Sequence, residues 1–241
     1  MRVCYFDSAA QVGQAAAVLI NAQLLKKPES VLGLATGSTP VPTYNQLIHL
    51  HSQGVADFSK AVSYNLDEYV GIAIDHECSY HRFMDDNLFN HVNMRREAIH
   101  VPDGLAEDLG AAAAAYDEAI DAAGGIDIQV LGIGRNGHIG FNEPGEEFVY
   151  GCHVVDLTAD TIDANKRFFD SADDVPRQAV SLGIGSIMKA KQILLIATGK
   201  DKAHAVNMMI NDAISPRVPA TILRTHPNVI VLLDKEAASE L

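Results

Sequence analysis

Basic residues are scarce in this sequence. Its 241 residues include 18 lysines and arginines against 31 aspartates and glutamates, which gives a formal net charge of −13. Nucleic-acid phosphates and anionic membrane surfaces repel a chain with this charge. We therefore expect no nucleic-acid partner and no membrane partner, although a local site can still bind a small anion.

Cysteines are also few, and long apolar segments are absent. Three widely spaced cysteines without a C-x-x-C pair are typical of reduced thiols in a cytoplasmic protein. The longest apolar runs, "ILLIA" and "VIVLL", are far too short to span a bilayer. The first residues, "MRVCYFDS", lack the apolar core of a signal peptide. The sequence predicts a cytoplasmic location.

Several motifs of metal and serine chemistry are missing as well. The ten histidines are scattered, and neither an H-E-x-x-H motif nor a zinc-type cysteine–histidine spacing occurs. No serine stands in a G-x-S-x-G turn, so nothing supports a serine hydrolase. We expect no metal site.

What the sequence does contain is a repeated alternation of apolar strands and helical segments. The strand-like segments are 2–6, 30–34, 61–66, 126–133, 153–157, 192–197 and 229–233. Helical patterns fill 8–25, where Ser8 and Gln11 resemble a capping box, and 40–52, 79–89, 108–123, 158–169 and 201–211. No linker divides the chain. We predict an α/β fold with three α/β/α layers, a mostly parallel, open, Rossmann-like sheet, and a single domain over residues 1–241.

Glycine-bearing loops follow three of the apolar strands. They occur in "LGLATGSTP", "VLGIGRNGH" and "LLIATGKDKA". In open α/β sheets, ligands bind outside the carboxyl ends of the strands. The three loops could therefore face one crevice.

The first loop has the features of a phosphate site. Gly37 allows close backbone approach, Ser38 and Thr39 offer hydroxyls, and we expect Thr39 to cap a helix that starts at Pro40. The loop lacks a P-loop lysine and is not G-x-G-x-x-G, so it does not indicate a nucleotide. A plain turn that binds nothing is the alternative.

Two cations could reach the same anion. Lys202 follows a later strand in "ATGKDKA", together with Lys200, and Arg167 lies in "NKRFF". Solvated surface side chains are the alternative for both.

Acid–base groups stand in two other segments. In "SYNLDEYVG", the adjacent Asp67 and Glu68 must point in opposite directions if they lie on a strand, so only one of them faces the crevice. That carboxylate could act as a general base. An aspartate that caps a turn is the alternative. In "LGIGRNGHIGFNEPG", His138 with Glu143 as its orienting partner forms a candidate proton-transfer pair, and Asn136 adds a hydrogen-bonding group. The alternative is a structural histidine, whose ring only forms hydrogen bonds within its own loop.

Taken in this order, "LGLATGSTP", "NLDEYVG", "LGIGRNGHIGFNEPG", "ANKRFF" and "ATGKDKA" resemble glucosamine-6-phosphate deaminase over residues 1–236. The resemblance implies conversion of glucosamine 6-phosphate and water to fructose 6-phosphate and ammonia, in amino-sugar breakdown, without metal or organic cofactor. It implies that Asp67 is the enolisation base and His138 the ring-opening acid and base, with Glu143 and Asn136 as its partners. It assigns the phosphate to residues 37–39, Arg167 and Lys202.

The chain departs from that family at three places. Position 136 is Asn where the long, allosteric members carry Asp, and position 38 is Ser where many members carry Gly. The sequence also stops at Leu241, whereas long members continue into a segment used for hexamer contacts and for an N-acetylglucosamine-6-phosphate effector site. We expect a monomer or a small homo-oligomer with constitutive activity.

Two other functions remain open from the sequence. A 6-phosphogluconolactonase-like hydrolase shares the glycine–threonine loop but needs no enolising carboxylate. A non-catalytic sugar-phosphate sensor needs a DNA-binding extension, for which the charge of −13 gives no support. Residues 144–170, which we expect to be largely helical, are a candidate lid over the site.

Overall fold

The computed structural model of the chain describes residues 1–166, 169, 171 and 174–241. Within these residues, parallel strands form a seven-stranded sheet in the order β1-β10-β9-β6-β2-β3-β5. The strands are β1 (Arg2–Phe6), β2 (Val31–Leu34), β3 (Val62–Asn65), β5 (Ile99–His100), β6 (Ile128–Leu131), β9 (Ile193–Ala197) and β10 (Val229–Asp234). Every residue of β2, β6 and β9 is buried, which confirms the prediction of strands covered on both faces.

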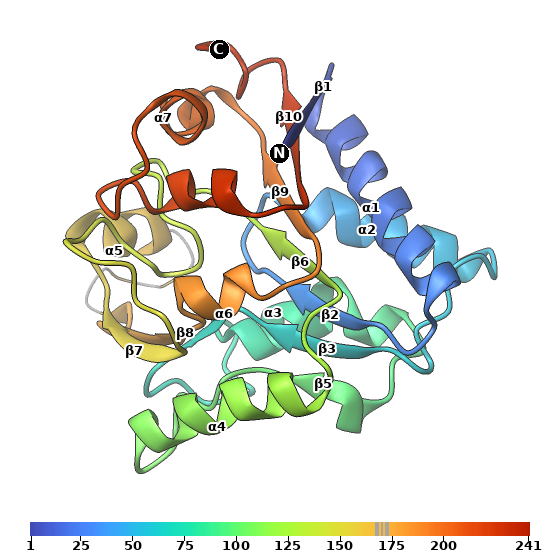
Figure 1. Cartoon of the computed structure of the whole chain (residues 1–241). Helices are drawn as coiled ribbons and strands as arrows, with labels where there is room; N and C mark the ends of the chain where they lie inside the picture. The colour runs from blue at the N-terminus through green and yellow to red at the C-terminus, as the bar shows by residue number, and fades with distance from the viewer. Residues whose placement is uncertain (167–168, 170, 172–173) are drawn as a thin grey trace.

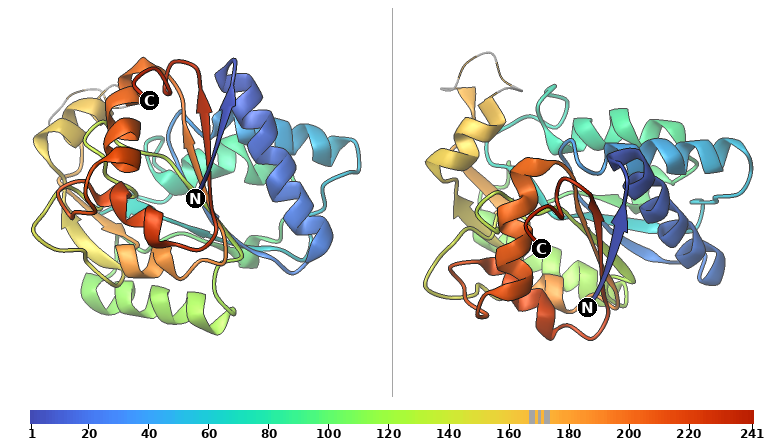
Figure 2. Two further views of the ribbon diagram at one scale, coloured as in Figure 1. Left: turned by 45° about the horizontal axis from the view of Figure 1, so that its top comes forward. Right: turned by 90° about the horizontal axis from the view of Figure 1, so that it is seen from above.

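Helices cover both faces of this sheet. They are α1 (Ala9–Lys26), α2 (Val41–Ser52), α3 (Tyr80–Asn87), α4 (Leu109–Ala122), α5 (Ala159–Asn165), α6 (Ile184–Met188) and α7 (Ala203–Asn211). Short 3-10 helices are η1 (Phe89–His91), η2 (Arg96–Ala98), η5 (Lys200–Lys202) and η6 (Pro219–Thr225). Helices α1 and α2 pack together on one face, and α4 and α7 lie on the other (Figures 1 and 2). The predicted three-layer, mostly parallel α/β fold is therefore confirmed.

A second, antiparallel sheet stands beside the first. It has the order β4-β8-β7, with β4 (Asp67–Tyr69), β8 (Gln178–Ser181) and β7 (His153–Asp156). The sequence analysis missed β4 and β8 as strands, because both are short and β4 pairs with β8, about 110 residues further along the chain. Leu66 joins the two sheets, since its N–H donates to Leu34 O at 3.0 Å and its carbonyl accepts from Leu182 N at 2.8 Å.

Two segment predictions were wrong in part. Residues 144–152 are not helical, because Pro144, Gly145 and Gly151 interrupt the run; within the described part of 144–170, α5 is the α-helix. The first helical residue of α2 is Val41, not Pro40, and Pro40 itself stands at the cap with no side-chain capping bond. The reason is that Pro42 has no N–H, so the first bonds of the helix run from Thr43 and Tyr44 to Pro40 O.

Candidate active site

The three glycine-bearing loops do meet at one edge of the sheet. Strands β9, β6 and β2 are neighbours and run parallel, so the loops that follow them leave from the same edge. Strand β3 lies next to β2 and leads through Leu66 into β4, which begins with Asp67. All the segments singled out in the sequence, apart from Arg167, therefore converge on the carboxyl edge, as the topology rule for open α/β sheets predicts.

The loop between β2 and α2 has the geometry of an anion site. Gly37 has φ +94°, which side chains rarely adopt, and the space beside its Cα is open. Among the hydrogen bonds of the described residues, none uses the N–H groups of Gly37, Ser38 or Thr39. The loop is held from behind by Tyr44, whose hydroxyl bonds both the N–H and the carbonyl of Ala35. A fixed loop with unused N–H groups before a helix is suited to a phosphate.

Asp67 lies buried between the two sheets. It is paired across the strands with Ser181, and a Cβ placed on Gly140 would lie 3.8 Å from its Oδ2, so it borders the loop that carries His138. Burial, with a further contribution from the charge of Glu68, raises the pKa of Asp67 to about 8. A carboxylate with this pKa is a much stronger base than an exposed aspartate.

The loop after β6 holds the imidazole of His138 against its own backbone. A Cβ on Gly134 would lie 2.3–2.4 Å from three atoms of the His138 ring, so the ring occupies the space that a side chain would need. Gly134 N also donates to His138 O at 2.9 Å. Residues 132–137 match G-x-G-x-x-G, yet no helix follows directly, so the segment lacks the structural context of a dinucleotide-binding loop.

Glu143 is the centre of a small polar network. Its Oε2 lies 3.3 Å from Nδ1 of His138 and accepts from Nδ2 of Asn136 at 2.8 Å, and its Oε1 accepts from the hydroxyl of Thr161 in α5. Asn136 also accepts the N–H of His138 through Oδ1 at 3.2 Å. Burial acts to raise the pKa of Glu143, but the contacts with His138, Thr161 and Asn136 outweigh it and hold the pKa at about 2. The carboxylate is therefore ionised and can stabilise a positive imidazole.

Of the two basic side chains predicted to bind the phosphate, the structure describes one. Lys202 ends η5 after β9 and is half-buried, so it stands at the same edge as the β2–α2 loop. The preceding turn is fixed by Gly199, whose N–H donates to both carboxylate oxygens of Asp234 at 3.0 and 3.1 Å. Arg167 lies outside the described residues.

The sequence analysis missed two residues that support the site. Ser181 Oγ accepts the N–H of Phe141 at 3.0 Å and so ties the His138 loop to the strand that pairs with Asp67. Thr161 bonds Glu143 from α5. Neither Ser181 nor Thr161 stands in a recognisable sequence motif. Only the pairing of β4 with β8 and the placement of α5 reveal what these two residues contact.

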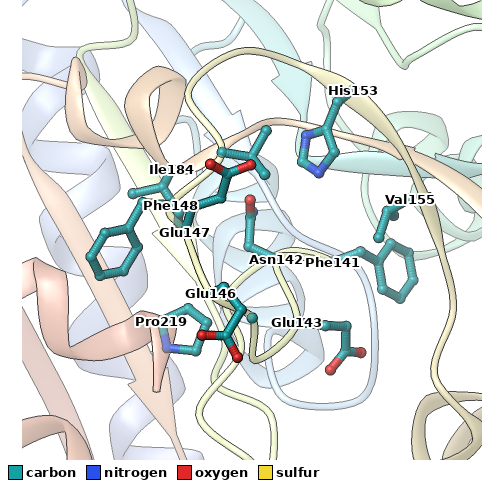
Figure 3. A pocket seen from close by; sticks show the side chains of 12 residues that line it. Phe141, Asn142, Glu143, Glu146, Glu147, Phe148, His153, Val155, Ile184 and Pro219 are labelled. Atoms are coloured by element: carbon teal, nitrogen blue, oxygen red, sulfur yellow. The ribbon is translucent and has the colours of Figure 1, made fainter. Parts of the chain in front are cut away.

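A cavity of about 190 Å³ lies behind Glu143 (Figure 3). Phe141 and Val155 stand on one side of it and Phe148 and Ile184 on the other. Neither Asp67 nor His138 lines this cavity, so it is separate from the crevice that those two side chains border. Among the described residues, no group of three or more His, Cys, Asp or Glu side chains is arranged to hold a metal ion. None of the described helices is long and apolar enough to cross a membrane.

Known proteins resemble this chain over its full length. The family model described as glucosamine-6-phosphate isomerases/6-phosphogluconolactonase matches residues 7–231. Glucosamine-6-phosphate deaminase of Thermoanaerobacter pseudethanolicus is 52% identical over 99% of this chain and 94% of its own length. The deaminase of Clostridioides difficile is also 52% identical, over 100% of this chain and 97% of its own.

Solved structures agree with the sequences. A monomeric glucosamine-6-phosphate deaminase superposes with a TM-score of 0.98 at 44% identity, with both chains covered completely. A 6-phosphogluconolactonase from Trypanosoma brucei superposes with a TM-score of 0.77 at 22% identity, covering 100% of this chain and 98% of its own, which shows a shared fold alone. The chain therefore belongs to the family of glucosamine-6-phosphate isomerases and 6-phosphogluconolactonases, and within it to the glucosamine-6-phosphate deaminases.

Proposed function

We propose that this enzyme converts glucosamine 6-phosphate and water to fructose 6-phosphate and ammonia. The observation that carries the proposal is the meeting, at one sheet edge, of a buried basic carboxylate, Asp67, with the His138–Glu143 pair. The two groups come from different segments and can act on different faces of one sugar. The unused N–H groups of residues 37–39, with Lys202, supply a place for the phosphate.

Ring opening is the first task. His138 takes the proton of the C1 hydroxyl and returns a proton to the ring oxygen, which breaks the C1–O5 bond and leaves an aldehyde. The charge on the imidazole during this exchange is balanced by Glu143, which stays ionised because its pKa is held at about 2. Asn136 fixes Glu143 and the backbone of His138 at the same time.

Isomerisation and loss of ammonia follow. Asp67 removes the proton from C2 and delivers it to C1, while one proton of the substrate's ammonium group passes to O1. The aldehyde thus becomes an alcohol and C2 becomes an iminium carbon. Water adds to C2 and ammonia leaves, which gives the ketone. C1 is reduced as C2 is oxidised, so the proposed reaction needs no redox or organic cofactor and consumes one water, as a hydrolase does. The phosphate provides binding energy far from C1 and C2.

We also infer that residues 1–241 act as one domain and one monomer. The main buried core includes residues from Val12 to Ala237, so it joins both ends of the chain. The deaminase with 44% identity and a TM-score of 0.98 is described as monomeric. A cytoplasmic location is supported by the sugar-phosphate substrate and by the few, separated cysteines.

The test is an activity assay in which both reaction products are measured in the same samples. Purified protein is mixed with glucosamine 6-phosphate in the presence of a chelator, and ammonia and fructose 6-phosphate are followed by separate coupled assays. We expect equal, catalytic amounts of both. Hydrolysis of 6-phosphogluconolactone without either product would favour the lactonase, and Asp67→Asn would then keep most of that activity because ester hydrolysis needs no enolising base.

A further inference from the structure

Glu68 is a buried carboxylate that the proposed reaction does not use. Its side chain stands next to Asp67 in β4 and the residue is only 5% exposed. Burying a carboxylate without partners is costly, so its contacts must offset the lost hydration. Those contacts are backbone N–H groups.

Both oxygens of Glu68 accept hydrogen bonds of good length. Oε1 accepts from the N–H groups of Tyr69 and Tyr80, each at 2.9 Å, and Oε2 accepts from the N–H of His81 at 2.9 Å. Burial raises the pKa of Glu68, and the three N–H donors act in the opposite direction because they favour the ionised form.

Two of these donors open helix α3. Tyr80 and His81 are its first two residues, and the next N–H, that of Arg82, donates to Ser79 Oγ at 3.0 Å. The first N–H groups of a helix have no partner within the helix and favour negative charge. Glu68 therefore fixes the start of α3 to β4, and the helix end in turn holds the charge of Glu68 in place.

We propose that Glu68 is a positioning residue for Asp67: a carboxylate fixed by three backbone N–H groups, it locks β4 to α3 and places a negative charge beside the base. On its other edge β4 pairs with β8, which sets Asp67 opposite Ser181. The strand that carries the base is thus held from two directions. This inference rests on the proposed role of Asp67 in the reaction.

The charge of Glu68 has a consequence for the base. Burial raises the pKa of Asp67 most, and the neighbouring negative charge raises it further. Other titratable groups also interact with these two carboxylates; they are Tyr44 on α2, Tyr69 on β4, Tyr80 and His81 at the start of α3, Tyr116 on α4 and Cys152. Cys78 acts on Tyr69. Burial raises the pKa of the four tyrosines, and that of Cys152 to about 12, so these five are neutral while Asp67 titrates. His81 interacts electrostatically with Glu68 and therefore needs its own control.

The pH dependence of kcat/KM tests the proposal. Glu68→Gln removes the charge and keeps the size of the side chain, so the acidic limb of the profile moves to lower pH, on the order of one unit. Glu68→Asp keeps the charge and shortens the side chain, so its limb stays near that of the wild type although the activity falls. Thermal unfolding checks that both variants are folded.

Three outcomes would overturn the proposal. One is a folded Glu68→Gln enzyme whose acidic limb coincides with that of the wild type. Another is an equal shift of the acidic limb in Glu68→Asp, since the shift would then result from the changed packing of the side chain and not from the loss of its charge. The third is a shift of the same size and direction in His81→Gln, since that would make the imidazole the source.

A measurement on the wild-type protein keeps the proposal testable if Glu68→Gln does not fold. Carboxyl carbon signals of Asp67 and Glu68, assigned through the backbone by NMR, are followed against pH. We expect Glu68 to lose its charge at a lower pH than Asp67, and the reverse order would overturn the proposal. Because this titration needs no turnover, it separates failure of the proposal from failure of the proposed reaction.

Discussion

Nδ1 of His138 lies 3.3 Å from Oε2 of Glu143, and the same oxygen accepts a hydrogen bond from Asn136 at 2.8 Å. Nδ1 is buried, and its contact with Oε2 is longer than the hydrogen bond from Asn136. Asn136 takes the better-aligned position on that oxygen. The imidazole is therefore held by this contact with the carboxylate and by the backbone of Gly134 beside it.

That backbone contact gives the first prediction. In Gly134→Ala, the new Cβ would lie within 2.4 Å of the His138 ring, so the ring must move. Displacing a catalytic group by about 1 Å costs about 10²-fold in rate, and we expect kcat/KM to fall by that order. Gly132→Ala is the matched control, because its Cβ meets nothing within 4 Å, and it keeps wild-type activity. Equal activity in the two folded variants would contradict the prediction.

The second prediction concerns the charge of Glu143. Glu143→Gln removes the charge that balances a positive imidazole, and we expect kcat/KM to fall by about 10²-fold, within the range of general acid–base catalysis. Glu147→Gln, an exposed glutamate of the same segment, is the control and changes activity little. Steady-state kinetics on both variants decide the matter, and a Glu143→Gln enzyme as active as the control would exclude the proposed role.

Acid stability gives a third prediction. The pKa of Glu143 is about 2 in the folded protein against 4.5 for a free glutamate, so its ionised form stabilises the fold above about pH 4.5. This contribution is lost as pH falls from 4.5 towards 2, at about 1.4 kcal/mol per pH unit. Urea unfolding below pH 4.5 should show a steeper loss in the wild type than in Glu143→Gln. Parallel curves for the two proteins would argue against a depressed pKa.

Asp67→Asn should separate activity from stability. The pKa of Asp67 is raised from 3.8 to about 8, so the folded state binds a proton that the unfolded state releases, and this residue destabilises the fold increasingly as pH rises from 3.8 to 8. The variant should lose deaminase activity by at least about 10²-fold and gain stability relative to the wild type. That gain in stability should increase by about 3 kcal/mol between about pH 5 and pH 7. Urea titrations at both pH values measure it, and a constant difference would contradict the raised pKa.

Asn136→Asp tests the departure from the long, allosteric family members. The substitution removes the donor to Glu143 and adds a second negative charge beside His138. Two carboxylates favour the protonated imidazole, so the limb of the pH–rate profile that follows His138 should move to higher pH. Profiles of kcat/KM for both enzymes give the answer. Superimposable limbs would show that the charge at this position does not act on the histidine.

Much of the fold could be predicted from the sequence because its signals are local. Unbroken apolar runs such as β2 and β9 mark strands buried on both faces, and Ser8 marks the start of α1, where its hydroxyl accepts the N–H of Gln11. Local signals failed at two strands of the second sheet, β4 and β8, although they identified the third, β7. The three residues of β4 show no alternation long enough to identify, and their strand conformation depends on β8, more than 100 residues away.

The candidate site divides in the same way. The sequence by itself determined which chemical groups are available, because the glycines, His138, Glu143 and the Asp67–Glu68 pair stand in recognisable segments. Only the tertiary structure decided what each carboxylate can do. Burial makes Asp67 a base, two N–H donors at the start of α3 and one in β4 hold Glu68 in place, and contacts from two segments keep Glu143 ionised. A pKa depends on the groups that surround a carboxylate, and those are brought together by strand order and helix placement, which no local pattern encodes.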